Sequence, residues 1–320
     1  MAAVPKLLFL NSSKYCQLPN QYALASAGNG YEFTVLTTSA DAQSFISSTQ
    51  DIHTFVSNEP NYELFNLLRS QNPDTNCVLM TDLPMDKYSR ELKNREEQLV
   101  DHVIANREGD WPIHDLRICC QKLISSDIFG IDKYLREDTP IHTVSVSDSS
   151  KRDEYNNLVT DFASSCRLSS YLSKMIWGIS EEMLMNAIYD APAAAGIKRF
   201  QGIPRTTKMT LEPQECATLS FGCDGEVFVM SSSDPFGVLK KDRLLTYLKK
   251  VLQRDQSEDI IDSKAEGAGL GLFKILYSCH DISCNVSKGK QTEIIALIEL
   301  DQQIRDFAKM PRSIHFYSPA

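Results

Sequence analysis

The sequence lacks the features that would decide its class at once. No apolar run reaches the roughly 18 residues of a membrane-spanning helix, so we expect no membrane span. The apolar stretch near the start is short and follows a single lysine. It is typical of a first buried strand rather than of a signal peptide, and favours a cytoplasmic protein. Proline (13 residues) and glycine (14) are not in excess, and 42% of the residues are apolar, as in ordinary globular proteins.

Patterned cysteines and positive charge are also missing. The nine cysteines are odd in number and contain no C-x-x-C pair, which argues against a disulfide framework and against a zinc site. Reduced thiols in a cytoplasm are the simple interpretation. Lysine and arginine (33) are outnumbered by aspartate and glutamate (42), giving a formal net charge of −9. Because nucleic-acid binding needs concentrated positive charge, we expect no such partner.

The length of 320 residues predicts two domains. The first, residues 1–140, alternates helical candidates, such as 61–71 and a closing helix over 115–135, with short β-rich apolar segments. These segments are residues 6–10, 31–38, 52–57, 76–82 and 101–106. The alternation predicts an α/β fold with a doubly wound parallel sheet.

A polar stretch rich in serine and aspartate, residues 137–153, marks the boundary with a second domain over 141–305. Two helices are expected to open that domain, one capped near Ser150 and one running from about Ser169 to Tyr189 and stopping before Pro192. Hairpins are then predicted, and two further helices, at 240–252 and 272–280, lie between them. The hairpins turn at Asp224-Gly225 and at Lys288-Gly289-Lys290. Residues 306–320 form an aromatic tail that could dock on another surface or pack on this one.

The segment "NYELFNLLRSQNPDTNCVLMTD" (61–82) resembles the helix, turn and fourth strand of a two-component receiver domain, with Thr81 at the receiver's hydroxyl position. The resemblance implies acids after the first and third strands and a lysine after the fifth. The matching positions here carry only amides and hydroxyls: Asn11, Ser12, Ser13, Ser57, Asn58 and Asn106. Without clustered carboxylates neither Mg²⁺ nor a phosphoryl group has a site. We therefore interpret the first domain as a pseudo-receiver, a docking or dimerisation module, so a homodimer is among the expected assemblies.

Three boxes in the second domain resemble, in their order and spacing, those of the GHKL nucleotide-binding domain. They are "EEMLMNA" (181–187), "SSSDPFG" (231–237) and "GAGLGL" (267–272). This domain is shared by gyrase, the Hsp90-type chaperone, histidine kinases and MutL, and the chain looks most similar to histidine kinases and anti-sigma-factor serine kinases. The resemblance implies a Bergerat-type α/β sandwich that binds ATP and Mg²⁺.

Glu182 and Asn186 are four residues apart and project from one face of a helix. The resemblance implies that the Asn186 amide oxygen binds Mg²⁺ and that Glu182 is the general base. Both roles suit the chemistry, because a hard cation takes oxygen ligands and a base must reach the attacking hydroxyl. The alternative is an amphipathic helix whose solvent-exposed face includes an acid and an amide without a functional role.

The resemblance assigns the other boxes to the nucleotide. Asp234 would accept a hydrogen bond from the adenine amine. Phe236 stands where the family has its first glycine, and Gly237 follows one residue later. The alternative is that Asp234 and Pro235 only form a turn that closes a strand. The glycine-rich box would bring backbone N–H groups to the phosphates, unless it only links a strand to a helix. Its residues are Gly267, Gly269, Leu270, Gly271 and Leu272. The polar segment before it would be a lid, and Thr292 would lie beside the adenine, unless it is only a β-former.

No histidine lies in the sequence pattern expected of a phosphoacceptor, which is followed by an acid and then by a proline. His114 is followed by an acid but by no proline, and His142 lies in a serine-rich stretch, so neither is assigned that role. The sequence thus favours an ATP-binding signalling protein that hydrolyses ATP or transfers its phosphoryl group to a partner protein. A non-enzymatic nucleotide-dependent switch is the alternative, and a pair of degenerate scaffold domains is a third.

Overall fold

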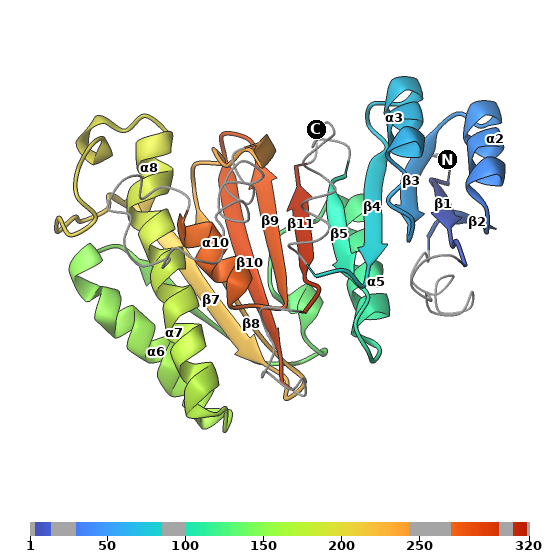
Figure 1. Ribbon diagram of the computed structural model, residues 1–320. Coiled ribbons are helices and arrows are strands. Elements are labelled where there is room, and N and C mark those ends of the chain that lie inside the picture. The colour runs from blue at the N-terminus through green and yellow to red at the C-terminus, as the bar shows by residue number, and fades with distance from the viewer. Residues whose placement is uncertain (1–3, 14–29, 85–99, 243–269, 301–309, 319–320) are drawn as a thin grey trace, which may run out of the picture. The chain divides into compact units, whose positions relative to one another are not determined.

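The computed structural model describes residues 4–13, 30–84, 100–242, 270–300 and 310–318 (Figure 1). The chain divides into two compact units. The first comprises Met1–Ile128 together with Lys309–His315, and the second comprises Phe129–Ala308 together with Phe316–Ala320. Both units mix helices and strands, as the sequence predicts. No helix among the described residues is long and apolar enough to cross a membrane.

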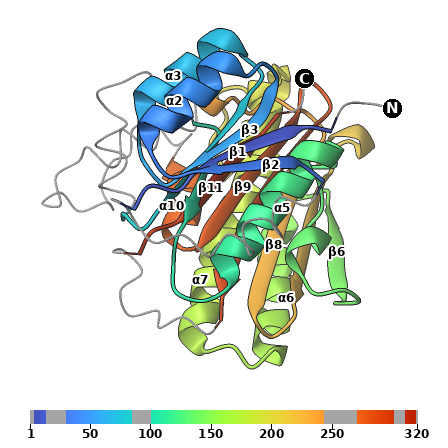
Figure 2. The ribbon, with the colours of Figure 1, turned by 90° about the vertical axis from the view of Figure 1, so that its right-hand side faces the viewer.

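The first unit is built on parallel strands that alternate with helices, which confirms the predicted α/β pattern. The strands follow the order β2-β1-β3-β4-β5, the order of flavodoxin-like doubly wound sheets. They are β1 (Lys6–Leu10), β2 (Glu32–Leu36), β3 (Ile52–Ser57), β4 (Asn76–Thr81) and β5 (His102–Ala105). Helices α2 (Ser39–Ser48) and α3 (Tyr62–Gln71) lie over one face and α5 (Trp111–Ser125) over the other (Figures 1 and 2).

Burial on both faces explains the composition of these strands. Consecutive residues of β1, from Leu7 to Leu10, are all at most 1% exposed, so the strand shows no alternation of apolar and polar residues. Helix α3 turns Leu64, Phe65 and Leu68, which lie on one face at helical spacing, into the same core.

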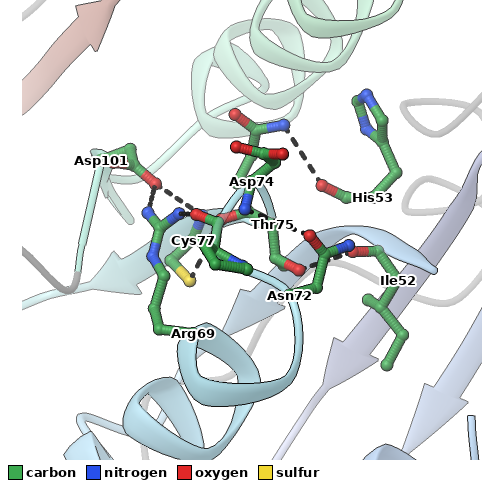
Figure 3. Close-up of polar contacts among 10 residues, drawn as sticks. Ile52, His53, Arg69, Asn72, Asp74, Thr75, Cys77 and Asp101 are labelled. Atoms are coloured by element: carbon green, nitrogen blue, oxygen red, sulfur yellow. Dashed lines mark hydrogen bonds and ion pairs between the residues drawn. The ribbon is translucent and has the colours of Figure 1, made fainter. Parts of the chain in front are cut away.

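A polar network fixes the amino end of β4 (Figure 3). The Asp101 carboxylate pairs with the guanidinium of Arg69 and accepts the backbone N–H of Cys77 at 2.9 Å. The Thr75 hydroxyl donates to the carbonyl oxygen of Ile52 at 2.7 Å. These contacts tie helix α3, the turn after it and the start of β3 into one unit, so the network is structural.

The C-terminal tail contains a strand that the sequence did not predict. Strand β11 (Ser313–Tyr317) runs antiparallel to β5, with His315 opposite His102. The Ser313 hydroxyl also accepts the backbone N–H of Ala105 at 3.0 Å. Part of the tail therefore packs on this chain, which decides between the two alternatives that the sequence left open.

The second unit is an antiparallel sheet with the strand order β9-β10-β8-β7-β6. Figure 1 shows helices in front of it. The strands are β6 (Ile141–Val146), β7 (Ala217–Cys223), β8 (Val227–Asp234), β9 (Asp281–Ser287) and β10 (Gln291–Glu299); the helices are α6 (Arg152–Ser165), α7 (Ser170–Met185), α8 (Ala191–Ala194) and α10 (Leu270–Tyr277). Both predicted hairpins are confirmed. Short 3₁₀ turns cover Asp132–Tyr134, Ser149–Lys151, Lys198–Phe200 and Pro213–Glu215.

One predicted helix end is wrong, and one strand was missed. Helix α5 ends at Ser125 and not at 135, because Ser126 adopts a left-handed conformation (φ 58°) that terminates it. The polar stretch 137–153, which was interpreted as the mark of a domain boundary, contains strand β6. This strand pairs with another strand on only one side among the described residues and exposes serine and threonine, so its polar composition hid it. The predicted helix at 240–252 lies almost entirely outside the described residues.

Candidate functional site

Helix α7 carries the acid and the amide that the sequence singles out. The Ser169 hydroxyl caps it by accepting the N–H of Leu172 at 3.2 Å. The helix was predicted to stop before Pro192, and this is wrong. A π turn over Asn186–Asp190 continues it, with the Ala191 N–H donating to the Asn186 carbonyl oxygen. The wide turn leads into α8, where Pro192 occupies the first turn and needs no N–H acceptor. Single π turns of this kind are frequent at functional sites.

The two adjacent acids of α7 have different surroundings. Glu181 faces α6, where it accepts from the Asn156 amide at 2.8 Å and pairs with Arg152 at 3.4 Å. Glu182 faces α10, and its Oε1 is 2.5 Å from the Nζ of Lys274. The Glu182 side chain is only 13% exposed, whereas that of Lys274 is 55% exposed. Glu181 is therefore a structural acid, and Glu182 is the acid available to the site.

Gly271 brings the backbone of α10 against both predicted residues of α7. A Cβ atom at this position would lie 2.8 Å from Oε2 of Glu182 and 3.3 Å from Oδ1 of Asn186. Only glycine permits this approach without displacing a side chain. The structure thus places Glu182, Asn186 and Gly271 side by side.

The remaining residues of the glycine box are placed only in part. Gly267 and Gly269 lie outside the described residues, as does the predicted lid. Leu270 begins α10, and Leu272 is 8% exposed, so it belongs to the core of the unit.

The side-chain amide of Asn186 is incompletely satisfied. Its Nδ2 atom is buried and has no hydrogen-bond partner in the part of the chain that the structure describes. A buried amide without a partner is costly, so a ligand or a further polar group is needed to complete it. At the far end of the π turn, Asp190 pairs with Arg205, which holds the loop after α8.

Asp234 and Thr292 are cross-strand neighbours on β8 and β10. Burial raises the pKa of Asp234 to about 6, although hydrogen bonds from the backbone of Phe236 and Gly237 lower it in part. The Phe236 N–H donates to Asp234 Oδ1 at 3.0 Å. This carboxyl is a strong acceptor held away from water. The π turn contacts β8, so the strand of Asp234 borders the segment that begins at Asn186.

Gly237 has a structural reason to be glycine. Its φ is +59°, and a Cβ there would lie 2.1 Å from the carbonyl oxygen of Ser287, the last residue of β9. The Gly237 carbonyl oxygen accepts the N–H of Gly289 at 3.1 Å. The loop after Asp234 is thereby fixed on the second hairpin, whatever its role in binding.

The edge of the first unit where β1 and β3 end is occupied by hydrogen bonds between its own polar groups. The Asn58 side chain accepts the Ser12 N–H at 2.8 Å and donates to the Ser12 carbonyl oxygen at 2.9 Å. Asn11, Ser12 and Asn58 do meet there, because the parallel strands β1 and β3 end side by side. The described residues bring no cluster of carboxylates to this edge, and the one group of three metal-ligating side chains found among them lies elsewhere.

Lys274 is the functional candidate that the sequence did not reveal. It follows Gly271 by three residues, so both lie on one face of α10. Helical spacing could have indicated it, but only a three-dimensional structure shows that this face meets Glu182. His142, in contrast, is an exposed residue of β6 whose ring stacks on Phe221, with ring centroids 5.5 Å apart.

Comparisons with known proteins identify no family. The chain matches none of the protein-family models compared with it, and no curated protein matches it either. Among solved structures, one match is a chain from the crystal structure of the SiaB–SiaC complex of Pseudomonas aeruginosa. The two chains are 15% identical, the match covers 50% of this chain and 88% of that one, and the TM-score is 0.32.

Proposed function

We propose that the second unit is a GHKL-type, Bergerat-like ATP-binding domain and that the first is a receiver-like docking or dimerisation module without a phosphoryl site. The protein would act in the cytoplasm as a signalling component with protein partners. The observation that supports ATP binding best is the approach of Gly271 to Glu182 and Asn186, since three residues from two separate boxes of the motif meet at one place.

Each residue has a chemical task in this proposal. Asn186 would offer its amide oxygen to Mg²⁺ and its Nδ2, which lacks a partner among the described residues, to a phosphate oxygen. Asp234 would accept the adenine amine, beside Thr292. The first N–H groups of α10 have no intrahelical acceptor and would bind phosphate oxygens.

The reaction proposed is transfer of the terminal phosphoryl group to a partner protein or to water. Glu182 would take the proton of the attacking hydroxyl, because it alone of the two acids faces α10. Its ion pair with Lys274 keeps the carboxylate occupied. An incoming phosphate competes for the Lys274 ammonium, which would release Glu182 when nucleotide is bound.

The test combines binding with turnover. Calorimetry with a non-hydrolysable ATP analogue and Mg²⁺ should show one site, and γ-labelled ATP should lose or transfer its label. Glu182→Gln should retain binding and lose turnover by about 10²- to 10⁴-fold, the contribution of a general base. The matched control is Glu181→Gln, which removes the neighbouring acid and its contacts to α6 but should leave turnover intact.

Two results would count against the enzyme. Absence of binding at millimolar nucleotide would contradict the site itself. Binding without turnover, with candidate partners present, would instead favour the second candidate, a switch in which nucleotide changes which partner docks. The amide- and hydroxyl-filled edge of the first unit favours that alternative, because the described residues there offer no phosphoryl acceptor.

A further inference from the structure

Three metal-ligating side chains meet in the core of the first unit, whereas the residues of the proposed nucleotide site belong to the second unit. They are His102 on β5, Cys119 on α5 and His315 on β11. One candidate ligand atom from each lies within 4.8 Å of the other two, and the Nδ1 atoms of the two histidines are 3.3 Å apart. All three residues are at most 1% exposed. The pairing of β11 with β5 sets the two histidines directly opposite each other.

We propose that His102, Cys119 and His315 bind a thiophilic metal ion with a filled d shell, Zn²⁺ or Cu⁺. Zinc–nitrogen bonds of about 2.0–2.1 Å at tetrahedral angles set two imidazole nitrogens about 3.4 Å apart, close to the separation seen here. Thiolate and imidazole ligands select zinc and copper over Mg²⁺ or Ca²⁺, which prefer oxygen. The three ligands come from distant parts of the chain, so no local spacing such as C-x-x-C in the sequence indicates this metal site.

Asp115 provides the support that metal-binding histidines commonly have. Its Oδ1 is 3.1 Å from Nε2 of His315, and Asp115 itself is 2% exposed. A carboxylate that holds one ring nitrogen orients the other toward the metal and raises its basicity. Here it leaves Nδ1 of His315 directed at His102, which is the geometry a bound ion requires.

The competing interpretation is a buried ion pair without metal. Burial lowers the pKa of His315, but the Asp115 carboxylate close to Nε2 raises it by more. A metal ion held by the three side chains would displace the thiol proton of Cys119 and would occupy Nδ1 of His315, while Nε2 keeps its proton toward Asp115. Metal binding and proton release must therefore occur together.

The test uses the full chain, stripped of metal by a chelator under reducing conditions and titrated with Co²⁺. We expect one equivalent to bind, with a thiolate-to-cobalt absorption band and release of protons to a pH indicator. Cys119→Ser should abolish the band and weaken Co²⁺ binding by about 100-fold or more, beyond the 10- to 100-fold expected for the supporting change Asp115→Asn. Cys120→Ser, at a neighbouring position that is equally buried, should bind like the wild type.

Competition of Zn²⁺ against a chelating dye, and of Cu⁺ against a copper(I) chelator without oxygen, identifies the preferred ion. Circular dichroism checks that each variant folds. If Cys119→Ser does not fold, the wild-type titration decides, and native mass spectrometry should then show one ion gained and protons lost. A wild-type protein with no cobalt–thiolate band, or a band equally strong in folded Cys119→Ser, would overturn the proposal and leave the ion pair.

Discussion

Replacement of Gly271 by alanine separates binding from stability. The new methyl group would lie 2.8 Å from Oε2 of Glu182, the far end of a flexible side chain that can give way. Alanine is favoured over glycine in a helix by up to about 1 kcal/mol. We therefore expect Gly271→Ala to fold, with the midpoint of thermal unfolding unchanged or raised by roughly 2–4 °C for a unit of this size.

Nucleotide binding should respond in the opposite direction. The methyl group fills the space between the backbone of α10 and Asn186, which the proposal reserves for phosphate and Mg²⁺. Loss of one hydrogen bond to a charged oxygen costs about 1.5–3 kcal/mol, or roughly 10- to 100-fold in affinity. Calorimetric titration with the ATP analogue and Mg²⁺ measures this loss.

The matched control is Gly178→Ala, also in a helix. A Cβ at Gly178 meets nothing within 4 Å, so this variant should gain similar stability and bind nucleotide like the wild type. Equal affinity of Gly271→Ala and wild type would refute the placement of phosphates beside this glycine. A large drop in thermal stability of Gly271→Ala would show that its close approach is a packing contact.

Two further predictions concern the loop and strand around Asp234. Gly237→Ala should destabilise the second unit by more than about 2 kcal/mol, because the left-handed conformation costs roughly 1–2 kcal/mol and the Cβ meets the backbone of Ser287. The control is Gly202→Ala, where φ is +69° and a Cβ meets open space, so this variant should lose only the conformational part. Urea denaturation measures both losses. Burial raises the pKa of Asp234 from 3.8 to about 6. Between about pH 4 and 6, the Asp234 carboxyl is therefore protonated in the folded state and ionised in the unfolded state. Stability should fall by about 3 kcal/mol as the pH rises through that window and then level off, and Asp234→Asn should remove this dependence; an unchanged pH profile would contradict it.

Local patterns predicted the parts of the fold that local interactions determine. Strand β3 was predicted with its observed bounds, and the hairpins turn where Gly225 and Gly289 adopt positive φ. Strand β6 was missed because three of its exposed side chains, His142, Thr143 and Ser145, are polar. Strand β11 was missed because its pairing with β5 involves residues far away in the sequence. No pattern within a short window contains such a partner.

Local patterns also predicted only those parts of the candidate site that lie close together in the sequence. The helical spacing of Glu182 and Asn186 put them on one face, but it could not show that Gly271 would touch that face or that Lys274 would pair with the acid. The π turn that carries the helix past Pro192 was also unforeseen, since proline normally predicts a helix end. These contacts depend on how α7 packs against α10, which spacing alone does not determine.

The pairing of β11 with β5 has a consequence for biosynthesis. A ribosome makes the strands of the first unit early but adds Ser313–Tyr317 only after residues 129–308, roughly 10–40 s later at ordinary elongation rates. Until then, the nascent chain carries β5 without this neighbour, and an uncovered strand edge invites association with other chains. A stop codon that removes Ser313–Tyr317 would therefore damage the unit that is translated first of the two.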